Sequence, residues 1–352
     1  INSMFYRADD FNQKFGENWD TRNLRDMGDL FNRAISFNQP FGISKGEKWD
    51  ISNVVNMCGM FYKASAFNQK FGENWDTKNL RNMRHMFSQA TSFNQPFGFS
   101  EGEKWDVSNV TDMSFMFEGA INFNQKFGEN WDTRNLRDMH GMFKDAVNFN
   151  QPFGFSEDKV WDVSNVVDMR DMFQGAVNFN QPFGISGGKI WDTGNVKYMC
   201  SMFLDAESFN QDCISNWNVS KVRDMADMFR RALNFNQALK WNTKRVTNMS
   251  YMFWRAIKFN QSLNWNTKSV IVMSSMFYGA TGFNQMLNFD TSNTTWMTQM
   301  FEGATSFNQK LDWKVSRVKS MYRMFFGASN FDKNNLDWDI SETTNTTEMF
   351  DK

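Results

Sequence analysis

The sequence predicts an α/β repeat solenoid of the leucine-rich-repeat type, with about thirteen coils that each contain a short parallel strand and a short helical segment. Three observations predict this fold. The tripeptide Phe-Asn-Gln recurs along the whole chain, the interval between copies is 24 to 30 residues, and two hydrophobic periods alternate within each interval. Intervals of about 20 to 29 residues are typical of leucine-rich repeats, whose coils bury their apolar side chains against one another.

The repeat unit is marked by the tripeptide Phe-Asn-Gln. A degenerate copy begins at Phe331, and the others begin at Phe11, Phe37, Phe67, Phe93, Phe123, Phe149, Phe179, Phe209, Phe235, Phe259, Phe283 and Phe307. Intervals of 26 and 30 residues lead up to Phe235, and intervals of 24 residues follow it. We therefore predict a single solenoid over residues 1–352, with long coils and edge loops over 1–234 and regular coils over 235–352.

Two hydrophobic periods lie within each coil. In the coil that begins at Phe259, large residues are two or four positions apart as far as Trp265, which favours a strand with one face inward. From Val270 to Ala280 the apolar residues follow in steps of three and four, which favours one or two turns of helix. Asp50 and its equivalents lie between such segments, where we expect them to cap backbone amides; a column of cation ligands is the alternative.

The polar residues of Phe-Asn-Gln are expected to form an amide ladder. Stacked coils place equivalent side chains above one another, and amides at such positions can hydrogen-bond along the column. The role that we expect is structural. The first members of this ladder are Asn12, Gln13, Asn38, Gln39, Asn68, Gln69, Asn94 and Gln95.

Basic side chains form a second set of columns, and these are the candidate binding residues. Three lysines occupy a site that holds proline in the intervening coils, and arginine or lysine pairs also recur in every second coil. A solvated face is the alternative to a binding stripe. With two lysines of the inserted edge loops, the set is Lys14, Lys70, Lys126, Arg22, Arg25, Lys78, Arg81, Arg134, Arg137, Lys45 and Lys104.

Composition excludes several classes of protein. The formal net charge of -1 indicates no general affinity for nucleic acid, and no apolar run approaches the roughly 20 residues of a transmembrane helix. Three cysteines do not form a disulfide framework. Only two histidines occur, at different phases of the repeat, and no phosphate-binding, dinucleotide or nucleophile motif is present. We therefore predict a protein that is not an enzyme and binds no cofactor or metal.

One stretch of the repeat resembles a known family. The segment that starts Val110-Thr-Asp-Met113-Ser-Phe-Met116-Phe117 and continues to Phe123-Asn-Gln is similar to repeats of the BspA-like leucine-rich-repeat surface proteins. It is most similar to the variant of mycoplasma surface lipoproteins of unknown function. The resemblance extends over essentially the whole chain, and it implies a leucine-rich-repeat fold, surface display and, in some members, adhesion.

These observations favour a non-enzymatic interaction or adhesion module at the cell surface or outside the cell, with a protein or glycan partner. The alternative is a structural scaffold subunit in a large complex or virion, joined to its neighbours laterally or end to end. Repeat solenoids suit either role because they present extended faces. We expect the functional face at the variable edge of the long coils and a spacer role for the regular coils.

Overall fold

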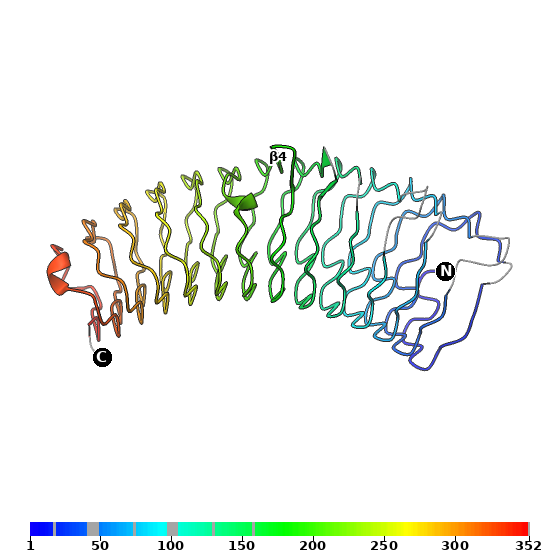
Figure 1. Cartoon of the computed structure of the whole chain (residues 1–352), viewed down its shortest axis with the longest axis horizontal. Helices are drawn as coiled ribbons and strands as arrows, with labels where there is room; N and C mark the ends of the chain where they lie inside the picture. The colour runs from blue at the N-terminus through cyan, green and yellow to red at the C-terminus, as the bar shows by residue number, and fades with distance from the viewer. Residues whose placement is uncertain are drawn as a thin grey trace. The chain divides into compact units, whose positions relative to one another are not determined.

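The computed structural model of the chain describes residues 1–16, 19–40, 49–72, 75–96, 105–128, 131–156 and 159–350 (Figure 1). The chain forms two compact units: unit 1 comprises 1–168 with 175–192, and unit 2 comprises 169–174 with 193–352. In each unit the same backbone path recurs from repeat to repeat (Figure 1). The change to 24-residue intervals at Phe235 lies inside unit 2. The predicted single domain stays a prediction.

The predicted α/β architecture is wrong. The described residues contain no α-helix, and their only helical turns are the 3-10 segments η1 (Asp212–Ile214) and η2 (Lys333–Asn335). No parallel strand runs through each repeat either. The named strands are the two-residue pairs β1 (Phe155–Ser156) with β2 (Lys159–Val160) and β3 (Ile185–Ser186) with β4 (Lys189–Ile190), both antiparallel. Within the described ranges no helix could cross a membrane.

A run of turns takes the place of the predicted helix. In the repeat that contains residues 57–67, the N–H groups of Met60 and Tyr62 donate to the carbonyl three residues earlier, at 3.3 and 2.9 Å. The N–H groups of Met57 and Gly59 donate instead to carbonyls of the next repeat, at 3.0 and 2.8 Å. Because alternate amides are committed to the neighbouring repeat, the i to i−4 ladder of an α-helix cannot form.

Each of these runs contains two residues with left-handed backbone, four positions apart. In the same repeat they are Gly59, with φ of 61°, and Lys63, with φ of 58°. A positive φ at the third residue is what a type II turn requires, and it reverses the chain within four residues. Each reversal returns an apolar side chain to the interior. Turns therefore produce the three- and four-residue steps that predicted a helix.

Single-residue parallel bridges join successive repeats at the position before the first buried methionine. In unit 1 the bridged series is Asp26, Asn56, Asn82, Asp112, Asp138 and Asp168, and in unit 2 it is Tyr198, Asp224, Asn248, Val272, Trp296, Ser320 and Asn345. The residues on both sides of each bridge face alternately outward and inward. This alternation sets which side chains of a repeat are available to solvent.

The core consists of stacked aromatic columns. Within one repeat the rings of Phe61 and Phe67 stack with centroids 4.0 Å apart, and each ring stacks on its equivalent in the next repeat, Phe87 at 5.5 Å and Phe93 at 5.9 Å. All four side chains are fully buried. Full burial of one such ring stabilises by about 1.5–3 kcal/mol. No single repeat could bury its own rings, so the repeats must stack.

Candidate functional site

The asparagines of Phe-Asn-Gln lie in a continuous ladder. Oδ1 of Asn12 accepts the backbone N–H of Asn38 at 2.9 Å and Nε2 of Gln39 at 3.1 Å. The same two bonds link Asn38 to Asn68 and Gln69, and link Asn68 to Asn94 and Gln95. Gln13 is exposed in the first repeat. Because each oxygen already accepts two hydrogen bonds, the ladder holds repeats together and has little capacity left for a ligand.

A second amide row runs beside this ladder in unit 1. Nδ2 of Asn148 donates to Oδ1 of Asn122 at 3.4 Å, and Nδ2 of Asn178 donates to Oδ1 of Asn148 at 3.2 Å. Both rows line an uncharged groove of about 710 Å³. The amides in this groove pair mainly with one another, so it is a weaker candidate for a binding site than a charged pocket.

The predicted basic columns are exposed, and part of them is neutralised locally. Three members pair with the aspartate two positions earlier in the chain: Arg22 with Asp20, Lys78 with Asp76, and Arg134 with Asp132. The hydrogen bond from Arg22 lowers the pKa of Asp20 to about 2. The remaining described members, all exposed, are Lys14, Lys70, Lys126, Arg25, Arg81 and Arg137. Lys45 and Lys104 lie outside the described residues.

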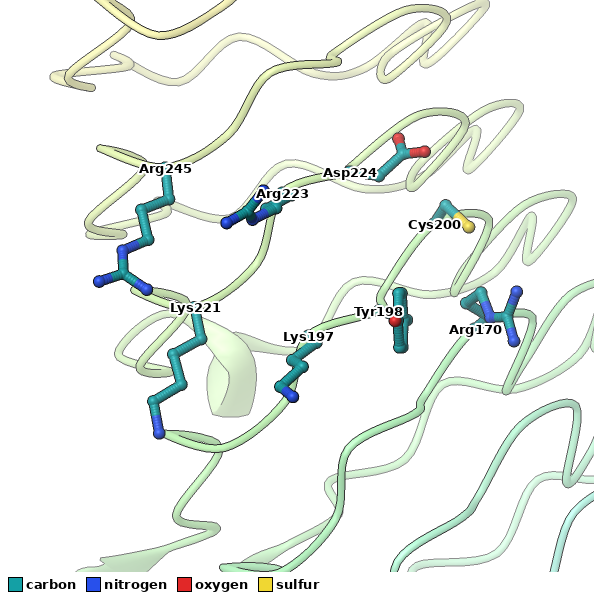
Figure 2. Close-up of a pocket in the computed structure, with 8 residues that line it drawn as sticks. All are labelled: Arg170, Lys197, Tyr198, Cys200, Lys221, Arg223, Asp224 and Arg245. Carbon is teal, nitrogen blue, oxygen red and sulfur yellow. The ribbon is translucent and has the colours of Figure 1, made fainter.

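A denser group of cations lines a pocket in unit 2. Figure 2 shows its lining, which we call the basic pocket: Arg170, Lys197, Tyr198, Cys200, Lys221, Arg223, Asp224 and Arg245. Its volume is about 590 Å³, which lies within the usual range for small-ligand pockets. Five of the eight lining residues are basic and one is acidic. The basic pocket therefore attracts anions.

Repeat geometry places four of these cations in two rows. Lys197 and Arg223 occupy equivalent positions in adjacent repeats, each directly before a residue of the parallel bridge between Tyr198 and Asp224. Lys221 precedes Arg223 by two positions, and the residue between them is fully buried, so both basic side chains point outward. Arg245 is the equivalent of Lys221 in the next repeat. Cations of adjacent repeats thus lie one inter-repeat step apart.

Tyr198 replaces a residue that holds the backbone in other repeats. At the same position Asn82 accepts the N–H of the residue two places later at 2.9 Å, as does Asp224. The phenol ring of Tyr198 has no acceptor near its Cβ and cannot make this bond. Its side chain is 47 % exposed, and the guanidinium of Arg170 lies 5.2 Å from its ring centroid.

Lys221 and Arg245 also replace a structural residue. The equivalent Asn79 and Asn293 donate their side-chain amides to a backbone carbonyl of the preceding repeat, at 2.7 and 2.9 Å. Lys221 instead donates Nζ to Oδ1 of Asn195. Within the described part of unit 2, no carboxylate lies within ion-pair distance of Lys197, Arg223 or Arg245. Their charges are left for a ligand or solvent to balance.

A family model described as a Mycoplasma protein of unknown function, DUF285, matches residues 1–100, 97–187, 183–288 and 263–352. Together these matches extend over the whole chain. The chain belongs to the DUF285 family. No match was found among curated proteins or among solved structures. The expected similarity to mycoplasma repeats of unknown function is confirmed at the level of this family, whereas the relation to BspA-like proteins stays a prediction.

Other reactive side chains in the described part of this DUF285 protein form no metal centre. Among the described residues, no three His, Cys, Asp or Glu side chains are arranged to hold an ion. The two histidines share a neighbour, since His85 and His140 both pack on the ring of Phe115, at 4.8 and 4.4 Å between centroids. Burial lowers the pKa of His85, which favours its neutral form.

The basic pocket was not among the sites predicted from sequence. The prediction concerned columns that recur in alternate repeats, whereas the pocket is formed where consecutive repeats depart from the consensus. The available signal was a cation in place of asparagine at Lys221 and Arg245, together with an aromatic residue in place of Asp or Asn at Tyr198. The same two positions also depart from Asp or Asn at Val272, Trp296 and Arg317, so these replacements alone do not single out the pocket.

Proposed function

We propose that this chain is a non-enzymatic binding module that acts at a cell surface or outside the cell, and that its partner binds at the basic pocket. One observation carries the proposal. Three residues of this one pocket, Tyr198, Lys221 and Arg245, replace side chains that elsewhere in the protein bond to the backbone. Departures from a local structural rule concentrate at functional sites.

The stability that these replacements cost supports this interpretation. A side chain that caps a turn or helix end contributes about 0.5–2 kcal/mol, and an ordinary hydrogen bond contributes about 0.5–1.5 kcal/mol. Three such backbone bonds are missing around the basic pocket. Val272, Trp296 and Arg317 show the same kind of departure elsewhere in unit 2, and the pocket differs in that cations, Lys221 and Arg245, replace the asparagine in consecutive repeats. Replacement of such structural side chains in adjacent repeats is expected where side chains serve a ligand.

The expected relation to BspA-like surface proteins, some of which act in adhesion, agrees with a surface-binding role. A varied set of outward side chains on a uniform backbone is also how repeat proteins acquire binding specificity. The scaffold alternative requires stable contacts between chains, made laterally or end to end.

The proposal is tested with a variant in which the pocket regains the consensus residue, Tyr198→Asn with Lys221→Asn and Arg245→Asn. This variant removes the pocket's chemistry while restoring side chains that sibling repeats use for structure, so it should remain folded. The matched control is Lys268→Asn with Lys314→Asn, which removes the same number of positive charges from exposed positions outside the pocket. Each purified full chain is applied to an array of immobilised extracellular proteins and glycans, and its mass is measured by light scattering.

We expect the native chain to be monomeric and to bind at least one array member, the control to bind it equally, and the pocket variant to lose about tenfold or more in affinity, the equivalent of 1.4 kcal/mol. Equal binding by the pocket variant would contradict the assignment of the site. Defined oligomers that bind no array member would favour the scaffold alternative and overturn the proposal.

A further inference from the structure

We infer that the basic pocket binds sulfate groups carried on a saccharide. This inference rests on the proposed function, because it names the ligand class of the same pocket. It goes beyond that proposal by specifying the charged group, its multiplicity and the uncharged part of the ligand. The observations that carry it are the array of cations, the single carboxylate and a described lining without Leu, Ile, Val, Met or Phe side chains.

The array of cations fits a ligand with more than one anionic group. Adjacent repeats joined by a parallel bridge lie about 4.8 Å apart, and side chains two positions apart on an extended segment lie about 7 Å apart. Lys197, Lys221, Arg223 and Arg245 therefore form two pairs on this spacing, and the second pair is shifted by one repeat relative to the first. One oxyanion can be contacted by two of them, and guanidinium groups bind oxyanions through paired N–H donors. Contact with all four cations needs at least two anionic groups, spaced by these steps of about 5 Å and 7 Å.

The carboxylate of Asp224 distinguishes a bare anion from a ligand that also has hydroxyl groups. Its Oδ1 accepts the N–H of Ala226 at 2.9 Å, and Asp224 is the one acidic residue of the described lining. A carboxylate repels a simple polyanion but accepts hydrogen bonds from hydroxyl donors. Sugar rings supply these donors beside their sulfate groups. A saccharide therefore satisfies both the cations and Asp224.

The lining disfavours nucleic acid and peptides. Single-stranded nucleic acid is held largely by stacking of bases on aromatic faces. The only aromatic lining residue is Tyr198, and the Arg170 guanidinium already lies over its ring. Peptide partners usually insert aromatic or aliphatic anchors into apolar pockets. The uncharged members of this lining are Tyr198 and Cys200, which do not form such a pocket.

The volume sets the size of the ligand. A pocket of about 590 Å³ can enclose one or two sugar rings with their substituents, and its lining comes from consecutive repeats of unit 2. Longer chains would extend beyond it along the outward face. We therefore expect the affinity to saturate at short oligosaccharides, in contrast to the steady increase with length that non-specific binding to a charged surface produces.

The test measures binding of a fluorescent heparin-derived hexasaccharide to the full chain at physiological ionic strength. The comparison ligands are the same hexasaccharide after desulfation and a DNA duplex of equal charge. The pocket variant is Arg223→Gln with Arg245→Gln, and the matched control is Lys268→Gln with Lys314→Gln, two exposed cations outside the pocket. Circular dichroism melting curves of all chains verify that the variants are folded.

We expect the sulfated hexasaccharide to bind, the desulfated one to bind at least about tenfold more weakly, and the pocket variant to lose about tenfold or more while the control stays within about twofold. Equal affinity for the DNA duplex, or equal loss in the control, would show a general charge effect and overturn the inference. No binding of the hexasaccharide, together with an array partner whose binding is lost in the consensus-restoring variant, would overturn this inference and leave the proposed function standing.

Discussion

Oδ1 of Asn94 accepts the backbone N–H of Asn124 at 2.9 Å, across an interval of 30 residues. The equivalent bond between Asn260 and Asn284 spans 24 residues and has the same length. The length of the hydrogen bond between successive asparagines of the ladder is therefore independent of the number of residues in a repeat. Extra residues of the long repeats are accommodated elsewhere, as in the hairpins β1–β2 and β3–β4, which leave the stacking of their repeats intact.

The ladder predicts a specific stability loss. Asn94→Ala removes the acceptor for the N–H of Asn124 and for Nε2 of Gln125, so both donors lose their partner. We expect a decrease of about 1–3 kcal/mol in the free energy of unfolding, measured by denaturant titration. Gln95→Ala is the control, because it removes one side-chain donor and leaves the backbone bond to Asn68 in place. A loss in the control as large as that in Asn94→Ala would contradict the ladder's role.

Asn248 and Tyr198 occupy the same repeat position, where Asp or Asn side chains accept the N–H two residues later. We predict that substitutions at these two residues change stability by different amounts. Asn248→Ala removes the oxygen that accepts the N–H and Oγ–H of Ser250, a buried residue, and should cost about 1–2 kcal/mol. Tyr198→Asn restores this kind of cap, worth about 1 kcal/mol, and gives up a cation–π contact with Arg170 of similar or smaller value. We therefore expect no decrease in the melting temperature for Tyr198→Asn. A clear decrease would mean that Tyr198 serves structure.

The sequence predicted the stacking of repeats but not the conformation within each repeat. Steps of three and four between apolar residues, as from Met57 to Met60 and Phe61, fit one face of a helix and fit successive turns equally well. The two differ in backbone hydrogen bonds, which the side-chain pattern does not encode. Positions with a positive φ would have distinguished the turns from a helix if glycine always occupied these positions. Here they are also held by residues such as Lys63, His85 and Phe115.

The candidate site was less accessible to sequence analysis than the ladder. Asn38 and Gln39 recur in nearly every repeat, so their stacking could be inferred from repetition alone. The basic pocket depends on differences between neighbouring repeats, such as Lys221 where Asn is usual. It also depends on which outward positions share a face. That information requires the register of the bridge between Tyr198 and Asp224.

A half-buried carboxylate in unit 1 predicts a pH dependence of stability. Burial raises the pKa of Asp138 above its usual value of 3.8, and the neighbouring carboxylates of Asp112 and Asp168 raise it further. Folding then favours the protonated form, so this group's contribution to stability is greatest at low pH and is lost as the pH rises from 3.8 through the raised pKa. At neutral pH its charge is unfavourable. Asp138→Asn keeps the side-chain acceptor, as at Asn82, and should raise the melting temperature by about 1–2 °C at pH 7.

Asp50 is the control, because its pKa is shifted in the opposite direction to that of Asp138. Hydrogen bonds with Ser52 lower its pKa, so its contribution to stability is present above the usual value of 3.8 and is lost as the pH falls through the lowered pKa. Asp50→Asn should not raise the melting temperature at pH 7. Differential scanning calorimetry of both variants from pH 3 to pH 8 measures the two effects. Equal shifts in both variants would contradict the assigned causes.

Glycine is required in unit 1 where the backbone approaches an indole ring of the next repeat. Gly72 has φ of 71°, its carbonyl accepts Nε1 of Trp105 at 3.0 Å, and a Cβ there would lie 2.7 Å from Cζ2 of that ring. Gly188 also has a positive φ, of 79°, but a Cβ there would meet no atom within 4 Å. Alanine at Gly188 should therefore cost only the backbone strain, about 1 kcal/mol.

Gly72→Ala adds a steric clash to the same strain, and it displaces an indole that is 4 % exposed and stacked on Trp75 at 6.0 Å. We expect a total loss of about 3 kcal/mol or more, because overpacking of a filled interior costs about 1–3 kcal/mol beyond the strain. Denaturant unfolding followed by tryptophan fluorescence compares Gly72→Ala with Gly188→Ala. If the two variants lose the same stability, the indole can move aside at no cost, and the close approach of Gly72 to Trp105 does not hold these repeats together.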